Sequence, residues 1–332
     1  MSVSTQDRFR GCLLGGAGGD ALGASIEFDS LSQIRSKFGE RGLSGYAEAF
    51  GRRGAISDDT QMSLWTAEGL LRARSGDNEK RIRDAYARWL HTQGSRAKEP
   101  SALDGWLIEQ DFLHSRRAPG HTCLSALERG EAIRGSKGCG GVMRVAPVGL
   151  AIDDPFETAT DAAAITHGHP TGSLSSGAFA EVIARLRVGD SLKGAVNRAM
   201  DVLRQHEHHE ETTRAIQAAV RTAESAPATP ETVETLGAGW IAEEALAIAL
   251  FCALVATDFR TGVLLAVNHS GDSDSTGAIA GNLLGTMLGV DAIPSDWLAE
   301  LEGKDVISQV ADDLYAGFVE QADVDRERYP GD

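Results

Sequence analysis

The segment Gly11-Cys12-Leu13-Leu14-Gly15-Gly16-Ala17-Gly18-Gly19-Asp20-Ala21-Leu22-Gly23 decides the fold of this chain. Its glycines at 11, 15, 19 and 23 recur every fourth residue, and glycines at 277, 281, 285 and 289 repeat that spacing. Residues four apart share one helix face, although each interior glycine costs about 1 kcal/mol relative to alanine. A ridge without side chains lets two backbones touch. We therefore predict two central helices that can lie in contact; partial loop structure is the alternative.

Helical patterning continues through the rest of the chain. Residues 81–90 place Ile82, Tyr86 and Trp89 on one stripe, and residues 174–186 carry apolar side chains four apart. Aromatic residues are only 6%, and no run of alternating β-branched residues indicates a strand. The sequence therefore predicts an all-α fold.

We found no shift in composition that would mark a second domain. We expect one domain over residues 1–332, a single orthogonal helical bundle with its core at about residues 8–320. Residues 240–257 are expected to form a long, mostly buried helix after a connection at 226–239. The polar end at 323–332 is expected to fray.

The chain is strongly acidic, with a net charge of −16 over 332 residues. Nucleic acid and anionic membranes bind positive patches, so neither is an expected partner. An anionic substrate would need local positive features, such as metal ions or helix N-termini. The longest apolar run, at residues 245–256, is too short to span a bilayer.

The four cysteines lie far apart and form no Cys-x-x-Cys pair. No N-terminal segment has the pattern of a secretion signal. We therefore expect reduced thiols in a cytoplasmic protein. As a separate prediction, we expect the protein to be a monomer.

Two acidic clusters carry the chemistry. Ser57-Asp58-Asp59-Thr60 and Gly271-Asp272-Ser273-Asp274-Ser275 each precede an apolar helical run. Taken alone, either cluster is typical of a helix N-cap. Four carboxylates brought together without cations would repel one another, whereas Mg²⁺ and Mn²⁺ prefer carboxylate and hydroxyl oxygens. If the clusters meet, the sequence predicts a two-metal site at helix N-termini.

Several further segments appear in a fixed order with these clusters. They are Arg8-Phe9-Arg10-Gly11-Cys12-Leu13-Leu14-Gly15, Gly19-Asp20-Ala21-Leu22-Gly23 with Glu27-Phe28, Gly138-Cys139-Gly140-Gly141-Val142-Met143-Arg144 and Thr166-His167-Gly168-His169. Together, over about residues 8–290, they resemble the ADP-ribosylglycohydrolase family. That family is all-α with a dimagnesium or dimanganese centre.

The resemblance implies a role for each matching residue. The metal ligands would be Ser57, Asp58, Asp59, Asp272, Asp274 and Ser275, and the catalytic residues would be Asp58, Asp59 and Glu27. Substrate would contact Glu27, Lys137, Gly138, Gly140, Gly141, Val142, Met143 and His167. Two Mg²⁺ or Mn²⁺ ions would hold the ribose and position water, because metals orient substrates and lower the pKa of bound water.

For some of these residues the pattern also fits a structural role. Glu27 also fits a surface loop, and His167 a helix-end hydrogen bond. Asp20, in an apolar stretch, is expected to make structural hydrogen bonds. Trp240 fits either a surface that stacks adenine or a buried core indole.

The resemblance predicts a hydrolase that cuts the N-glycosidic bond between ADP-ribose and a modified protein side chain. Arginine is the expected acceptor, because the Asp-Ser-Asp-Ser cluster and the loop Arg116-Arg117-Ala118-Pro119-Gly120 resemble those of the ADP-ribosylarginine hydrolases. Ala118 stands near the position where the branch that reactivates dinitrogenase reductase has an aspartate. The alternatives are hydrolysis of ADP-ribosyl-serine or O-acetyl-ADP-ribose, a non-catalytic ADP-ribose-binding protein, and a two-metal phosphohydrolase.

Overall fold

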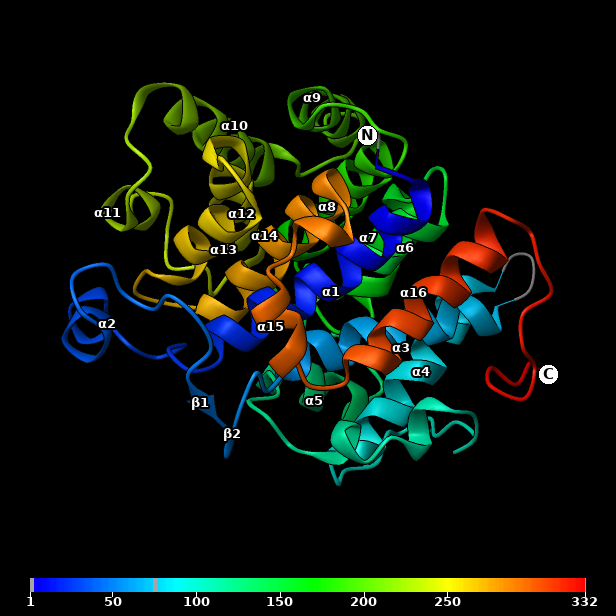
Figure 1. Ribbon diagram of the computed structural model, residues 1–332. Coiled ribbons are helices and arrows are strands. Elements are labelled where there is room, and N and C mark those ends of the chain that lie inside the picture. Colours follow the sequence, from blue (N-terminus) through cyan, green and yellow to red (C-terminus); the bar gives the residue numbers. More distant parts are fainter. Residues whose placement is uncertain (1–2, 74–76, 332) are drawn as a thin grey trace.

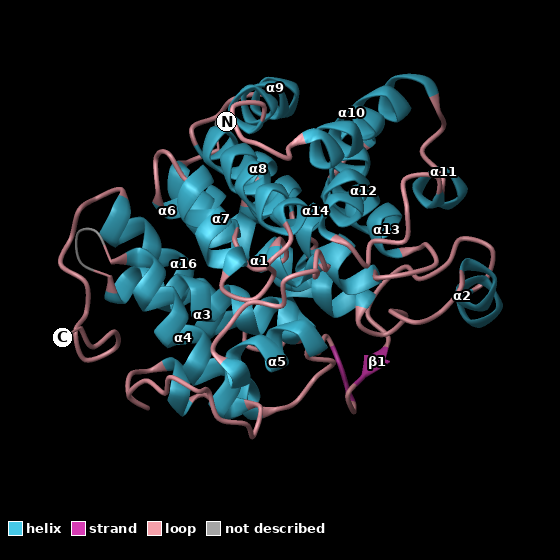
Figure 2. Cartoon of the chain, turned by 180° about the vertical axis from the view of Figure 1, so that it is seen from behind, coloured by secondary structure: helices cyan, strands magenta, loops and turns pink. Residues whose placement is uncertain are grey.

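The computed structural model describes residues 3–73 and 77–331, and helices make up most of it (Figure 1). In this described part the only strands are β1 (Glu48–Ala49) and β2 (Arg52–Arg53), a short antiparallel pair at the edge of the molecule (Figure 2). The prediction of an all-α fold is confirmed.

The α-helices are α1 (Thr5–Gly23), α2 (Leu31–Phe38), α3 (Asp58–Arg72), α4 (Asn78–Thr92), α5 (His121–Arg129), α6 (Ala146–Ala151), α7 (Phe156–Ala164), α8 (Pro170–Arg187), α9 (Leu192–Leu203), α10 (Glu210–Ser225), α11 (Pro230–Glu234), α12 (Ala242–Val255), α13 (Phe259–Val267), α14 (Ser273–Leu288), α15 (Ser295–Glu300) and α16 (Lys304–Phe318). Four short 3₁₀ helices are η1 (Leu107–Glu109), η2 (Asp111–His114), η3 (Cys139–Gly141) and η4 (Val290–Ala292). Within the described residues, no helix is both long and apolar enough to cross a membrane.

The two glycine-rich segments are helices α1 and α14, and they pack antiparallel at the centre of the molecule (Figures 1 and 2). A Cβ atom added at Gly19 would lie 2.0 Å from the carbonyl oxygen of Gly277, and one at Gly281 would lie 2.0 Å from that of Gly15. Both distances are far below van der Waals contact, so only glycine fits this interface. The predicted helices and their contact are confirmed, and loop structure is excluded.

The end of the ridge differs from the prediction. Gly289 follows the last residue of α14 with φ 81° and caps the helix, although its carbonyl carbon would still lie 2.8 Å from a Cβ atom added at Gly11. At the other end of the contact α1 meets Ser273, whose carbonyl oxygen lies 2.2 Å from a Cβ atom added at Gly23. The packing therefore continues to the first residue of α14, where the second acidic cluster stands.

Helix α12 is buried, as predicted, but shorter than the range 240–257. It begins at Ala242, because Gly239 has φ 83° and Ile241 is extended. Trp240 is thereby outside the helix and 42% exposed. The expected connection at 226–239 contains the short helix α11.

The C-terminal segment is docked, contrary to the expected fraying. Tyr329 is fully buried, and its hydroxyl donates to Asp313 on α16 at 2.8 Å. The guanidinium of Arg328 pairs with the same carboxylate at 2.7 Å. The polar composition of this segment gave no sign of the docking. One buried tyrosine and one ion pair stabilise the segment more than its polar residues favour exposure.

Candidate metal centre and ligand pocket

Helix α1 orients the first acidic cluster through Asp20. This aspartate is fully buried, and its carboxylate accepts hydrogen bonds from the amides of Ser57 at 3.0 Å and Thr60 at 3.2 Å. The Thr60 hydroxyl donates to it at 2.5 Å. Asp20 thus makes the structural hydrogen bonds that the sequence predicted, and they fix the N-terminus of α3.

The same helix brings the second cluster alongside the first. Because Gly23 lies against the backbone of Ser273 and Asp274, the turn that follows α1 places Glu27 beside α14. Carboxylate oxygens of Glu27, Asp272 and Asp274 lie within 4.8 Å of one another. Asp58 and Asp59 line the same pocket as these three. The two clusters therefore meet at the N-termini of α3 and α14.

Both clusters also cap their own helices. The Ser57 side chain accepts the amide hydrogen of Asp59 at 3.3 Å, and Asp272 accepts that of Ser275 at 3.4 Å. Each cap uses one oxygen atom, so capping alone does not account for the number of carboxylates in the centre.

Burial makes this concentration of acids unfavourable in the absence of cations. The pKa values of Asp58, Asp59 and Asp272 are raised well above the usual range, first by burial and next by the negative charge of Asp274. Burial and then Asp274 raise the pKa of Glu27 to about 9.

Two carboxylate oxygens in the centre have no protein partner. Asp59 Oδ2 and Asp272 Oδ2 are buried and make no hydrogen bond to any described residue. Buried polar atoms are normally satisfied, and divalent cations such as Mg²⁺ are bound through carboxylate oxygens. The donor set of Ser57, Asp58, Asp59, Asp272, Asp274 and Ser275, with Glu27 beside it, fits hard divalent cations.

A cavity of about 210 Å³ opens over these carboxylates. Its other walls come from the glycine-rich loop, from the segment around the start of α5 and from Trp240. The lining residues outside the acidic centre are Ala118, Gly120, His121, Thr122, Cys123, Gly138, Cys139, Gly140, Met143, His167 and Trp240. Of the predicted substrate contacts, Glu27, Gly138, Gly140, Met143 and His167 therefore line the pocket.

The other predicted contacts lie elsewhere. Gly141 and Val142 are buried behind the pocket wall, where a Cβ atom at Gly141 would meet Ala163 at 3.1 Å. The ammonium of Lys137 pairs with Glu243 and, at 2.9 Å, with Glu211. These ion pairs tie the Lys137 side chain to α10 and α12, and Lys137 is not among the residues that line the cavity, so its contact with substrate stays a prediction.

His167 reaches the pocket from behind the glycine-rich loop. A Cβ atom at Gly140 would lie 3.0 Å from the His167 ring, so glycine is needed there for the close approach. Burial and, secondarily, the Arg144 charge lower the pKa of His167 to about 3. The imidazole is therefore neutral at physiological pH.

The loop before α5, residues 116–120, contacts the acidic centre directly. The Gly120 amide donates to Asp58 Oδ2 at 3.2 Å, and the Asp58 amide donates to the Arg117 carbonyl at 3.2 Å. Arg117 in turn pairs with buried Glu302. Ala118 lines the pocket with φ 51°, a left-handed conformation that costs an alanine about 1–2 kcal/mol.

Sequence reasoning gave no role to His121, Thr122, Cys123 or Cys139, all of which line the pocket. Their proximity to the loop at 116–120 and to the glycine-rich loop was the available signal. All four cysteines of the chain are free thiols, as predicted.

Two exposed aromatic rings stand at the rim. Phe28 is 76% exposed, and its ring stacks on that of Trp240 with 5.5 Å between centroids and 17° between planes. Trp240 is thus not a core residue, and the alternative of a buried indole is wrong.

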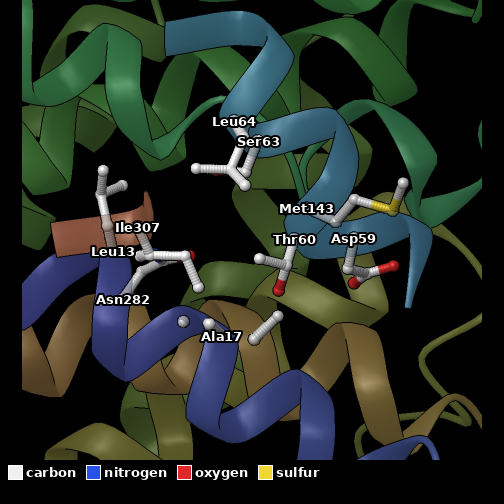
Figure 3. Close-up of a pocket in the computed structure, with 11 residues that line it drawn as sticks. Leu13, Ala17, Asp59, Thr60, Ser63, Leu64, Met143, Asn282 and Ile307 are labelled. Carbon is white, nitrogen blue, oxygen red and sulfur yellow. The ribbon is translucent and has the colours of Figure 1, made fainter. Parts of the chain in front are cut away.

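A second, much smaller cavity lies between α1, α3 and α14 (Figure 3). Asp59 and Met143 line both cavities and form the wall between them. Its volume of about 10 Å³ holds at most one water molecule. The ligand pocket is therefore the larger cavity on the other side of Asp59.

The fold and the site define a class of protein: an all-α protein whose buried carboxylates gather at two helix N-termini beneath a pocket with a glycine-rich wall. Comparison with known proteins gives the family. The ADP-ribosylglycohydrolase family model matches residues 1–323. The chain belongs to the ADP-ribosylglycohydrolase family.

Individual relatives are similar over nearly the whole chain. The ADP-ribosyl-[dinitrogen reductase] glycohydrolase of Rhodospirillum rubrum is 29% identical, over 91% of this chain and 92% of the relative. The ADP-ribosylarginine hydrolase Tri1 of Pseudomonas putida is 25% identical, over 93% of this chain and 78% of the relative. A solved structure described as an ADP-ribosylglycohydrolase-related protein complex has a TM-score of 0.71 and 28% identity, covering 94% of this chain and 98% of that one.

Proposed function

We propose that this protein hydrolyses the N-glycosidic bond between ADP-ribose and a modified arginine side chain of a protein. The observation that carries the proposal is the meeting of the two acidic clusters, with unpartnered oxygens on Asp59 and Asp272, at the floor of the 210 Å³ pocket. Family membership supplies the substrate class.

The centre would hold two divalent cations, Mg²⁺ or Mn²⁺, through the side chains of Ser57, Asp58, Asp59, Asp272, Asp274 and Ser275. Bound there, the ions would act as Lewis acids on the ribose hydroxyls and lower the pKa of a bound water. The Gly120 amide and the Arg117 carbonyl hold Asp58 in place for this ligand role.

The protein's own groups complete the reaction. Glu27 orients the ribose from the turn after α1. Asp59, at the floor of the pocket, accepts a proton from the attacking water. The water oxygen bonds to the anomeric carbon, the carbon–nitrogen bond breaks, and the proton taken up by Asp59 passes to the nitrogen of the leaving guanidine. The products are ADP-ribose and unmodified arginine.

The rest of the pocket would bind the remainder of ADP-ribose. Gly138 and Gly140 expose backbone next to the acidic centre, which suits a diphosphate. The exposed indole of Trp240 gives a flat surface on which adenine can stack.

Two arguments favour arginine as the acceptor. The acidic pocket complements the positive charge of a modified guanidinium, whereas the O-glycosidic bond to serine and the ester of O-acetyl-ADP-ribose are neutral. In addition, the Tri1 relative is an ADP-ribosylarginine hydrolase. The protein is expected to act as a monomer in the cytoplasm, as one domain over residues 1–332.

The test is release of ADP-ribose from defined conjugates. The protein with Mg²⁺ is incubated separately with ADP-ribosyl-arginine, ADP-ribosyl-serine and O-acetyl-ADP-ribose, and the products are separated chromatographically. Free ADP-ribose from the arginine conjugate supports the proposal. Release only from another conjugate would overturn the arginine assignment, and AMP as the product would indicate a phosphohydrolase. Calorimetric binding of ADP-ribose with no turnover would indicate a binding protein.

A further inference from the structure

Behind the pocket lies a buried cation that the proposed reaction does not use. Arg144 is fully buried, and every hydrogen bond that it makes to residues 3–73 and 77–331 goes to a neutral group. Its guanidinium donates to the Ala162 carbonyl at 2.9 Å and to the Thr166 hydroxyl at 2.7 Å. Longer contacts reach the sulfur atoms of Cys123 at 3.5 Å and Met62 at 3.7 Å. Tyr86 covers its guanidinium at 4.3 Å. A buried charge held only by neutral groups is costly, so we expect Arg144 to orient one of its neighbours.

The Thr166 hydroxyl links this cation to His167. A guanidinium can only donate, so Thr166 Oγ1 must accept the hydrogen bond from Arg144. The single hydroxyl proton then has two possible acceptors, His167 Nδ1 at 2.8 Å and the Ala163 carbonyl at 3.4 Å. Only the first distance falls in the normal range for a hydroxyl donor.

The alternative proton arrangement is less favourable. If Nδ1 carried the hydrogen, Thr166 Oγ1 would accept two bonds and could donate only over 3.4 Å. That arrangement would also turn a polar hydrogen of His167 toward the Arg144 charge. With the proton donated by Thr166, the guanidinium instead polarises the hydroxyl and strengthens the bond.

We propose that Arg144, acting through Thr166, fixes His167 as the tautomer that carries its hydrogen on Nε2 and donates it into the pocket. Whether one ring nitrogen of a histidine carries the hydrogen is set by the hydrogen bond that the other nitrogen makes. His167 Nε2 lies 3.3 Å from a Cβ atom added at Gly138, so it faces the glycine-rich wall. Arg144 and Thr166 are therefore positioning residues for a ligand contact made by His167.

The chemistry of the contact follows from the tautomer. A neutral N–H donor selects a hydrogen-bond acceptor, such as a diphosphate oxygen or an adenine nitrogen, and rejects a donor at the same point. Burial and the Arg144 charge lower the pKa of His167, which keeps the ring neutral while it does so. The identity of the ligand group that supplies the acceptor rests on the proposed function. The tautomer itself is independent of that function.

Nuclear magnetic resonance of the ligand-free protein tests the tautomer directly. In a long-range ¹H–¹⁵N spectrum, His167 is identified among the nine histidines as the signal missing from His167→Gln. We expect a protonated Nε2 and an unprotonated Nδ1. Thr166→Val removes the hydroxyl at nearly constant shape and should give a mixture of tautomers, whereas Thr166→Ser should retain the wild-type pattern. Hydrogen on Nδ1 in the wild type, or an unchanged tautomer in Thr166→Val, would overturn the proposal.

Arg144→Met tests the cation itself. It removes a buried charge at similar volume, so we expect a folded protein with mixed tautomers; an unchanged Nε2–H form would exclude Arg144 from the positioning role. If this variant does not fold, the comparison of Thr166→Val with Thr166→Ser still decides the Thr166 step, and Arg144→Lys, which keeps the charge and a donor, is expected to keep the wild-type tautomer.

Binding of ADP-ribose measured by calorimetry completes the test. Loss of a hydrogen bond to a buried ligand group should weaken binding about tenfold or more in His167→Leu. His167→Gln keeps an N–H near the position of Nε2 and should bind within a few-fold of the wild type. Equal loss in both variants would overturn the donor role. Absence of any ADP-ribosyl hydrolysis would overturn the proposed function while leaving the tautomer result intact.

Discussion

At the scale of single residues, the charge of Asp274 acts on each of the other carboxyl groups of the centre. This negative charge raises the pKa values of Glu27, Asp58, Asp59 and Asp272. Each of these carboxyls is also buried, so their mutual repulsion is weakly screened. A cation at this point would be attracted by every one of them, and removal of the Asp274 charge alone should change the whole centre.

We expect Asp274→Asn to stabilise the metal-free protein and to abolish its response to Mg²⁺. The neutral amide relieves repulsion that amounts to about 1 kcal/mol or more, but it is a poor cation ligand. In the wild type, Mg²⁺ at a hundred times its dissociation constant should add about 2.7 kcal/mol. Denaturant unfolding with EDTA and with Mg²⁺ measures both effects.

The matched control is Asp291→Asn, because Asp291 is an exposed aspartate in η4. It should change neither the metal-free stability nor the gain with Mg²⁺. A full gain with Mg²⁺ in Asp274→Asn would contradict the assignment of Asp274 as a ligand.

Ala118 provides a second prediction at this scale. Its φ of 51° suits glycine better than alanine, and its residue neighbours hold Asp58. Ala118→Gly should raise the free energy of unfolding by about 0.5–1 kcal/mol, whereas Ala118→Val should lower it, because a β-branched residue fits this conformation worst. Equilibrium unfolding in urea compares the two variants with the wild type; a more stable valine variant would be inconsistent with the strained loop.

At the scale of elements, the pair α1 and α14 could be predicted from the sequence because the evidence was periodic. Glycine at every fourth position identified two helices and the face on which they touch. The point where the ridge ends could not be predicted, since Gly289 continues the spacing but follows the last residue of its helix. Likewise, Trp240 continues an apolar run, and only the turn at Gly239 shows that α12 begins after it.

Adjacent glycines of α1 offer a sharp test of the interface. A methyl group at Gly19 would overlap the Gly277 carbonyl oxygen at 2.0 Å, but one at Gly18 would meet only the Tyr46 hydroxyl at 3.5 Å. Gly19→Ala should lower the free energy of unfolding by about 2 kcal/mol or more, as overpacking does. Gly18→Ala should raise it by up to about 1 kcal/mol through helix propensity.

Thermal and denaturant unfolding measures the stability of both variants. Because the same substitution is made at two adjacent positions, a difference in stability reports on the helix contact alone. Because α1 also aligns the acidic clusters, Gly19→Ala should weaken Mg²⁺ binding as well. Similar stabilities for the two variants would mean that the backbones do not touch as described.

At the scale of the whole molecule, the acidic residues of the site could be predicted from the sequence, whereas several residues that line the pocket around them could not. The two acidic clusters were predicted singly, and their meeting depends on the packing of α1 against α14, which no local pattern fixes. The ion-pair partners of Lys137 could not be predicted, because Glu211 and Glu243 come from helices far along the chain. The docking of Tyr329 onto α16 has the same origin. Contacts set by tertiary packing are those that the sequence left open.

The buried acidic centre makes the stability of the metal-free protein depend on pH, and bound metal should abolish this dependence. Burial raises the pKa of Asp20 from 3.8 to about 7 and that of Glu27 from 4.5 to about 9. At a pH between the ordinary pKa of each group and its raised pKa, the folded, metal-free protein holds more protons than the unfolded chain. Its stability therefore falls as pH rises through this range. We expect the unfolding free energy in EDTA to decrease steadily from about pH 5 to pH 9.

The net charge of −16 also opposes folding at high pH, and salt separates the two causes. Repulsion between exposed charges is screened within about 8 Å at 0.15 M salt, whereas the buried centre is screened much less. The decrease in EDTA should therefore persist when NaCl is added and should disappear with Mg²⁺, because bound cations favour the ionised carboxylates. Urea unfolding at pH 5, 7 and 9 in each condition provides the measurement. A metal-free protein whose stability rises over this range, or whose decrease vanishes with NaCl alone, would contradict a buried acidic centre as its cause.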